Sequence, residues 1–201
     1  MLNVRRFILT GAPGSGKTAI LRHLQAQGFS IVEEAATDLI ALRHAEGIDE
    51  PWMQPQFVSD VAELQMCRLE ESSDATEAVQ FHDRSVACTV ALARYLGFPE
   101  PASLTQAVER ILRNGVFQKT VFFVQPLGFI APTAARRITL EESLRFGQMH
   151  EEAYRSYGFD LRPIEPGPIA ERAAAVLDAV GAELERRSPA AGGAALRFHQ
   201  R

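Results

Sequence analysis

The architecture of this chain is indicated first by one run of eight residues, Gly11-Ala12-Pro13-Gly14-Ser15-Gly16-Lys17-Thr18. An apolar segment precedes the run and a segment with helical spacing follows it. A strand, a glycine loop and a helix in this order match the P-loop pattern G-x-x-x-x-G-K-[ST]. Glycines let backbone N–H groups turn toward a phosphate, and the helix adds its N-terminal dipole. The run therefore predicts a site for a nucleoside triphosphate.

Two side chains of the run have separate predicted roles. Lys17 would reach the β- and γ-phosphates, and the Thr18 hydroxyl would contact Mg²⁺. We expect Lys17 to be an exposed loop side chain that packs against nothing. The residues predicted to bind the nucleotide are Gly11, Ala12, Pro13, Gly14, Ser15, Gly16, Lys17 and Thr18.

Length and composition indicate one globular domain. The chain has 201 residues, of which 46% are hydrophobic and 23% charged, which is ordinary for a globular protein with a substantial core. We expect a single P-loop domain over residues 1–187 and a mobile C-terminal tail over residues 188–201, where Pro, Ala and Gly accumulate. The net charge of -4 argues against nucleic acid as a partner.

The cysteines and the hydropathy bear on where the protein works. Cys67 and Cys88 are far apart in helical patterns, so we expect two buried, reduced thiols and a cytoplasmic protein. No apolar run approaches the ~18 residues of a membrane helix, which predicts no integral membrane association. The sequence leaves open whether the chain forms a homo-oligomer.

Periodicity and breakers predict an alternation of strands and helices. The predicted strands cover residues 6–10, 29–32, 78–82, 120–124 and 159–164. The predicted helices cover residues 17–27, 35–45, 57–73, 86–96, 104–113, 139–157 and 169–187. This order favours right-handed crossovers and a three-layer α/β fold, with a parallel five-stranded sheet between helices on both faces. Periodicity does not give the strand order.

Charged residues follow two of the predicted strands. Glu34 comes after the second strand, and Asp83 and Arg84 come after the third. Ligands of such sheets bind at the carboxyl ends of the strands. Glu34 is therefore a candidate base, Asp83 a candidate Mg²⁺ ligand and Arg84 a candidate catalytic cation. The alternatives are that Glu34 caps the helix that follows and that Asp83 is purely structural.

Two loops are further candidates. The pair Arg136 and Arg137 lies in a loop bordered by Gly and Pro and could close over the transferred phosphoryl group, or simply be solvated. The loop 49–55, which contains Trp52, could contact substrate or be a plain connector.

The use made of the nucleotide is a separate question. A Ras-type GTPase would carry an N/T-K-x-D segment, and none occurs. A remodelling ATPase would end its acidic strand in a pair such as Asp-Glu, whereas here Asp83 is followed by Arg84. A small-molecule kinase needs a carboxylate base and mobile arginines around the phosphates, and the candidates above supply them.

Four segments resemble a known family. They are T-G-A-P-G-S-G-K-T (10–18), G-F-S-I-V-E-E-A-A-T-D-L-I (28–40), F-H-D-R-S (81–85) and E-R-A-A-A-V-L (171–177). They are similar to the P-loop domain shared by NadR-type nicotinamide riboside kinases and TRPL-translocation-defect proteins, commonly labelled AAA-type ATPases. The D-R-S is also similar to the E-R-S of deoxynucleoside kinases. Where the family has E-A-A-R, this chain has Thr37, and Ala134-Ala135 precede the arginines.

The resemblance covers about residues 5–185 and implies a nucleoside-kinase-like fold, ATP or GTP with Mg²⁺, a carboxylate base and an arginine-bearing lid. The sequence thus predicts an Mg²⁺-dependent ATP phosphotransferase acting on a small hydroxyl-bearing acceptor such as a nucleoside. The alternative is an ATPase or GTPase switch that binds a protein or lipid partner. The acceptor itself is not identified.

Overall fold

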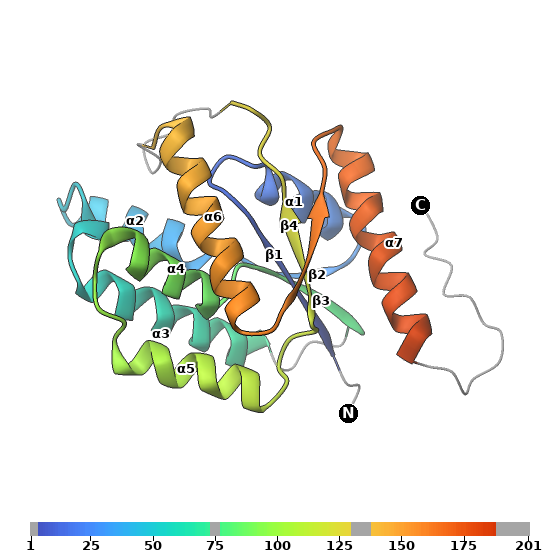
Figure 1. Cartoon of the computed structure of the whole chain (residues 1–201), viewed down its shortest axis with the longest axis horizontal. Helices are drawn as coiled ribbons and strands as arrows, with labels where there is room; N and C mark the ends of the chain where they lie inside the picture. Colours follow the sequence, from blue (N-terminus) through green and yellow to red (C-terminus); the bar gives the residue numbers. More distant parts are fainter. Residues whose placement is uncertain (1–3, 73–76, 130–137, 188–201) are drawn as a thin grey trace.

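The computed structural model describes residues 4–72, 77–129 and 138–187. Its centre is a parallel five-stranded sheet in the order β2-β3-β1-β4-β5 (Figure 1). The strands are β1 (Arg5–Thr10), β2 (Ser30–Val32), β3 (Val79–Asp83), β4 (Thr120–Val124) and β5 (Asp160–Ile164). The three-layer α/β prediction is confirmed, and the strand order is what the structure adds.

The helices follow the predicted segments closely. They are α1 (Lys17–Ala26), α2 (Ala35–Ala45), α3 (Gln56–Glu71), α4 (Val86–Leu96), α5 (Ala102–Arg113), α6 (Leu140–Ser156) and α7 (Ile169–Arg187), with a 3-10 turn η1 (Pro51–Met53). The capping box expected at the start of α6 is present, because Thr139 and Glu142 exchange side-chain and backbone hydrogen bonds. α5 begins two residues earlier than predicted, directly after Pro101.

The two faces of the sheet are covered by different helices. On one face, Phe7, Phe81 and Phe122 pack against α1 and α7. On the other face, Ile8 and Val121 pack against α4 and α6, and α3 and α5 form a further layer beside α4 (Figure 1). β4, buried from both sides, is nearly continuous in apolar residues, as expected for a parallel sheet. β3 is also buried along its whole length, but it alternates Val79 and Phe81 with the buried polar residues Gln80, His82 and Asp83.

This arrangement opens a crevice at the carboxyl ends of β1 and β3. The two strands pair in register, Leu9 with Asp83, yet the helices that follow them lie on opposite faces of the sheet. Such a point is where doubly wound sheets bind their ligands. The glycine loop after β1 and Arg84 after β3 meet at this crevice.

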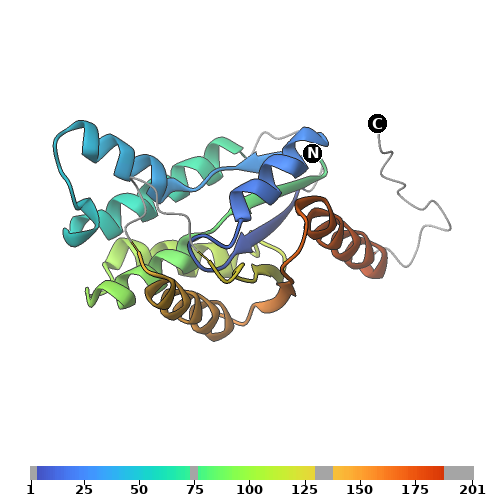
Figure 2. The same cartoon turned by 90° about the horizontal axis from the view of Figure 1, so that it is seen from above.

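A smaller group of elements extends beyond the sheet. α2, η1 and the start of α3 share their own apolar cluster, which includes Ala35, Phe57 and Trp52. In Figure 2 these elements project from the sheet on the side away from α7. They supply the far wall of the cavity described below.

One expectation from the sequence is wrong, and another lies outside the described residues. Cys88 is buried, but Cys67 is exposed on α3, so the prediction of two buried thiols is wrong for Cys67; neither forms a disulfide in the described part of the chain. Among the described helices, none is long and apolar enough to cross a membrane. The predicted tail, 188–201, lies outside the described residues.

Candidate functional site

A cavity of about 740 Å³ extends from the glycine loop to the group of elements around η1. This volume lies within the ~300 to 1,000 Å³ typical of small-molecule sites. One end, here called the loop end, is lined by Pro13, Gly14, Gly16, Lys17 and Thr18. The opposite end, here called the aromatic end, is lined by Trp52, Phe57, Val61, Leu92, Tyr95 and Phe146.

Glycines give the loop its shape. Gly11, Gly14 and Gly16 have φ angles of 137°, 83° and 89°, which side chains rarely adopt. A Cβ on Gly11 would lie 2.4 Å from the carbonyl oxygen of Val124. The loop can therefore lie against the end of β4 only with glycine at position 11.

Lys17 is not the exposed side chain that the sequence predicted. It is 6% exposed, and its Nζ donates to the carbonyl oxygens of Gly11 and Ala12, both at 3.3 Å. Burial, followed by the nearby charge of Arg84, lowers the pKa of Lys17 to about 8. The loop curls around its own lysine, a conformation that local sequence does not reveal, so the lysine charge is buried where phosphates would bind.

The two predicted magnesium ligands, Thr18 and Asp83, differ in whether they line the large cavity. Thr18 lines the cavity. Asp83 does not line this cavity: it is buried and lines a separate, small cavity of about 20 Å³, and its Oδ1 has no hydrogen-bond partner. Burial raises the pKa of Asp83 to about 6, and the charge of Glu34 acts in the same direction.

An orphaned carboxylate oxygen at the end of β3 fits a role as one ligand of a hard cation. The described residues include no cluster of three or more His, Cys, Asp or Glu that could hold a metal. Magnesium sites can be built from one or two carboxylates plus substrate phosphates. Thr18 and Asp83 would hold the ion.

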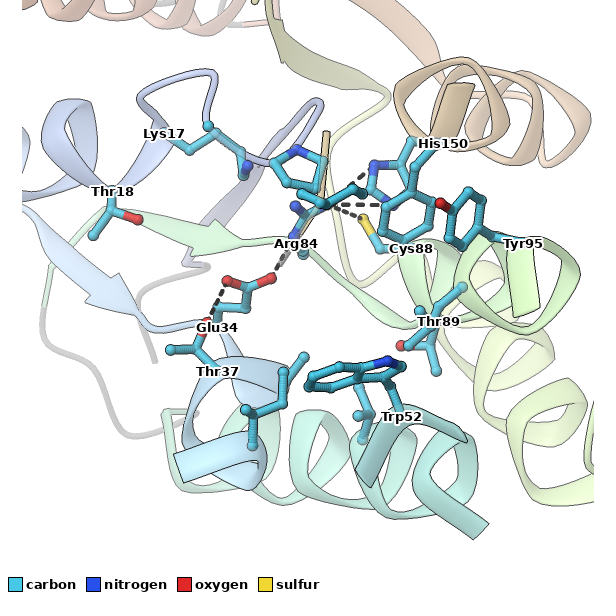
Figure 3. Close-up of a pocket in the computed structure, with 18 of the residues that line it drawn as sticks. Lys17, Thr18, Glu34, Thr37, Trp52, Arg84, Cys88, Thr89, Tyr95 and His150 are labelled. Atoms are coloured by element: carbon cyan, nitrogen blue, oxygen red, sulfur yellow. Dashed lines mark hydrogen bonds and ion pairs between the residues drawn. The ribbon is translucent and has the colours of Figure 1, made fainter. Parts of the chain in front are cut away.

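Glu34 and Arg84 form an ion pair in the middle of the cavity wall, with 2.6 Å between Arg84 Nε and Glu34 Oε1 (Figure 3). The hydroxyl of Thr37 donates to the other oxygen of Glu34 at 2.9 Å. Burial raises the pKa of Glu34, but the charges of Arg84 and Lys17 and these hydrogen bonds outweigh it and leave the pKa below its ordinary value. Glu34 is therefore ionised at neutral pH.

Glu34 stands at the N-cap position of α2 but does not cap the helix with its side chain, which makes no capping hydrogen bond. Its carboxylate is instead directed at Arg84 and Thr37, as Figure 3 shows.

An unusual backbone conformation positions Arg84. Its φ of 73° is the only positive value among the non-glycine residues that the structure describes, and such a conformation costs about 1 to 3 kcal/mol. Its N–H donates to the carbonyl of Leu9 at 3.0 Å, which ties it to β1. Its guanidinium also donates to the ring of His150, at 3.0 Å from Nδ1. Burial, and then the charges of Arg84 and Lys17, hold the pKa of His150 well below its ordinary value, so a neutral imidazole accepts this bond.

His150 belongs to a stripe on α6 that packs directly against the glycine loop and Arg84. Ser143 Oγ donates to the carbonyl of Pro13 at 2.7 Å. A Cβ on Gly147 would lie 3.1 Å from that of Ala12. The helical spacing of Ser143, Gly147 and His150 was visible in the sequence as small and polar residues on a buried face, but we did not predict their role.

The aromatic end combines apolar walls with a few polar groups. The rings of Tyr95 and Phe146 lie 4.8 Å apart, centroid to centroid. Thr89 donates to Oε1 of Gln65 at 2.7 Å, and both residues line the cavity. In Figure 3, Glu34 and Arg84 lie between Lys17 and Thr18 on one side and Trp52, Thr89 and Tyr95 on the other. The cavity therefore has room for a second, partly apolar molecule beyond the phosphate site.

The structure brings together most of the predicted residues. Lys17, Thr18, Glu34 and Arg84 line one cavity, and Trp52 lines it as well. Arg136 and Arg137 lie outside the described residues, so their role stays a prediction. Residues that sequence reasoning missed are Gln65, Thr89, Tyr95, Phe146 and His150.

Comparisons with known proteins identify a family and three solved structures of similar fold. A family model described as an AAA domain matches residues 6–172. No curated protein matches the sequence. A solved structure of NadR in complex with NAD and AMP-PNP is similar with a TM-score of 0.63 and 17% identity, over 95% of this chain and 51% of NadR.

Two smaller enzymes are also similar in fold. A deoxyadenosine kinase from M. mycoides matches with a TM-score of 0.52 and 13% identity, over 89% of this chain and 99% of that one. A shikimate kinase from Acinetobacter baumannii matches with a TM-score of 0.50 and 13% identity, over 90% and 96% of the two chains. These likenesses establish a P-loop kinase-like fold. The chain spans about half the length of the NadR structure.

Proposed function

This chain belongs to the AAA domain family, and we propose that it is an Mg²⁺-dependent phosphotransferase that moves the γ-phosphoryl group of ATP to a small hydroxyl-bearing acceptor. The observation that carries the proposal is the Glu34–Arg84 pair, which lies between a phosphate loop and a separate, partly apolar space in one cavity. A nucleotide hydrolase needs no second organic site. A kinase needs one next to its base.

The residues divide the work as follows. The backbone N–H groups of the glycine loop and Lys17 bind the phosphates. The acceptor lies against the aromatic end, where Trp52 and Tyr95 offer ring faces for a flat molecule such as a nucleoside. Its hydroxyl donates to the ionised carboxylate of Glu34, which takes the proton as the bond from the acceptor oxygen to the γ-phosphorus forms and the bond from that phosphorus to ADP breaks, with ADP as the leaving group.

Arg84 and His150 support the base. Arg84 holds one oxygen of Glu34 and adds positive charge near the reacting groups, which favours a transition state with spread negative charge. The neutral ring of His150 accepts from Arg84 without competing for Glu34. When bound, Mg²⁺ would neutralise charge on the phosphates, with Thr18 and Asp83 as its protein contacts.

ATP consumption measured over a panel of nucleosides and small polyols tests the proposal. We expect one class of acceptor to stimulate ADP formation and to yield a phosphorylated product detectable by mass spectrometry. Slow hydrolysis that no acceptor changes, together with tight nucleotide binding, would instead favour the nucleotide switch.

A further inference from the structure

Arg172, on the first turns of α7, is a buried cation beside the phosphate loop that the mechanism above does not use. It is 4% exposed. Its Nη1 donates to the carbonyl of Ser15 at 2.9 Å, and its Nη2 donates to the carbonyl of Gln125 at 3.0 Å. One guanidinium thus joins the loop after β1 to the residue after β4.

The contact with Ser15 fixes the orientation of a peptide in the loop. Glycine-rich loops lose much backbone entropy when they are ordered, and their N–H groups can face a phosphate only if the carbonyls point elsewhere. Arg172 holds the Ser15 carbonyl toward α7. A Cβ on Gly16 would lie 3.0 Å from Nη1, so glycine at position 16 also gives the guanidinium room to approach.

The charge of Arg172 is not matched by a carboxylate. In the part of the chain that the structure describes, no carboxylate oxygen of an Asp or Glu lies within 4 Å of a guanidinium nitrogen of Arg172. The buried Nε of Arg172 has no hydrogen-bond partner. Burial lowers the pKa of Arg172. A buried charge without a counter-ion is costly, and a bound polyphosphate on the adjacent loop would supply the missing negative charge.

We infer that Arg172 is a positioning residue of the phosphate site, which orients the Ser15 peptide and whose charge is balanced by the polyphosphate of the bound nucleotide. The inference rests on the proposed nucleotide-binding function. It concerns a residue outside the P-loop motif and outside the cavity lining. Ser143 braces the same loop at Pro13 from α6, but as a neutral hydroxyl it can contribute only orientation.

Titration calorimetry with ATP, AMP and inorganic tripolyphosphate tests this on wild type, Arg172→Met, Arg172→Lys and Arg172→Gln. Arg6→Met is the matched control, since Arg6 is another guanidinium whose pKa burial lowers and whose Nε donates to the side chain of Gln80, away from the loop. We expect Arg172→Met to lower the affinity for ATP and for tripolyphosphate about tenfold or more, the scale of a lost contact with a charged group. The affinity for AMP should fall less than the affinity for ATP. Arg172→Lys should bind ATP more tightly than Arg172→Gln, and Arg6→Met should bind all three ligands as wild type does.

The outcomes distinguish a failure of the proposed function from a failure of the role of Arg172 alone. Wild-type protein that binds neither ATP nor tripolyphosphate overturns the proposed function and, with it, this role. If wild type binds, unchanged ATP affinity in Arg172→Met overturns the role of Arg172 alone, as does an equal loss for ATP and AMP or an equal loss in Arg6→Met. If Arg172→Met does not fold, the Lys and Gln variants decide, and equal ATP affinity in these two overturns the charge component.

Discussion

The two ends of the cavity are built in opposite ways. The loop end consists of backbone from one run of eight residues, held by contacts from α6 and α7 at Pro13 and Ser15. The aromatic end consists of side chains that η1, α3, α4 and α6 bring together from distant parts of the chain. Phosphate binding is therefore specified locally in the sequence, whereas selection of the second molecule depends on packing.

The largest expected effect lies where the two ends meet. Glu34→Gln should lower phosphoryl transfer by about 10² to 10⁴-fold, because it removes a positioned base, while ATP affinity stays nearly constant. Glu33→Gln is the matched control, since its exposed side chain does not line the large cavity. Steady-state kinetics and calorimetry check this. Wild-type turnover in Glu34→Gln would show that Glu34 is not the base.

Lys17→Met tests the loop end alone. It should weaken ATP binding about 10- to 100-fold, the equivalent of ~1.5 to 3 kcal/mol for hydrogen bonds to a charged group. Because the folded-state pKa of Lys17 is lowered to about 8, its charge destabilises the nucleotide-free protein below that pH. The melting temperature of the free variant at pH 7 should therefore be at or above that of wild type. Unchanged ATP affinity would remove the P-loop assignment.

Asp83→Asn tests the metal contact and carries a pH signature. Binding of ATP with Mg²⁺ should weaken about tenfold, again the scale of a lost contact with a charged group, whereas binding of metal-free ATP should hardly change. The pKa of Asp83 is about 6 in the fold against an ordinary 3.8, so the nucleotide-free wild type gains stability as the pH falls through 6. The variant should melt above wild type at pH 8, with the difference shrinking by pH 5. Equal losses with and without metal would make Asp83 a structural residue.

Trp52→Ala tests the aromatic end alone. It should raise KM for the acceptor about 5- to 150-fold, because ~1 to 3 kcal/mol of apolar contact is lost, and leave KM for ATP unchanged. Met53→Ala should raise KM for the acceptor less, because Met53 also lines the cavity but is 59% exposed. A parallel rise in both KM values would mean that the two ends are not separable.

The smallest effect is expected from Thr37→Val. Thr37 donates to Glu34 and lowers its pKa, so its removal should raise that pKa and move the acid limb of the kcat profile to higher pH. At pH 8 we expect kcat to fall about 2- to 10-fold, the value of one ordinary hydrogen bond of ~0.5 to 1.5 kcal/mol. An unmoved pH profile would show that Thr37 does not act through Glu34.

The same contrast explains what the sequence could reveal. The glycine loop, the strands and Glu34 follow from local patterns, and the structure agrees with the predicted fold. The burial of Lys17 could not be predicted, because it depends on loop carbonyls that curl back toward the side chain. The positive φ of Arg84 has no local signal either, since arginine does not favour that region.

Tyr95, Phe146 and His150 were missed for a related reason. Tyr95 and Phe146 lie on different helices, and each fits the spacing of an ordinary core residue. His150 is fully buried and was hidden within the buried stripe of α6. Only the packing of α6 against the loop distinguishes these side chains from plain core residues.

The close approach of Gly147 to Ala12 has a consequence for how sequences of this kind can diverge. Alanine inside a helix is normally more stabilising than glycine by about 1 kcal/mol, so replacement of Gly147 by alanine would ordinarily be favoured. Here the added methyl would meet Ala12 at the base of the nucleotide site. Positions 12 and 147 should therefore covary in an alignment of relatives, so that a larger residue at one is accompanied by glycine at the other.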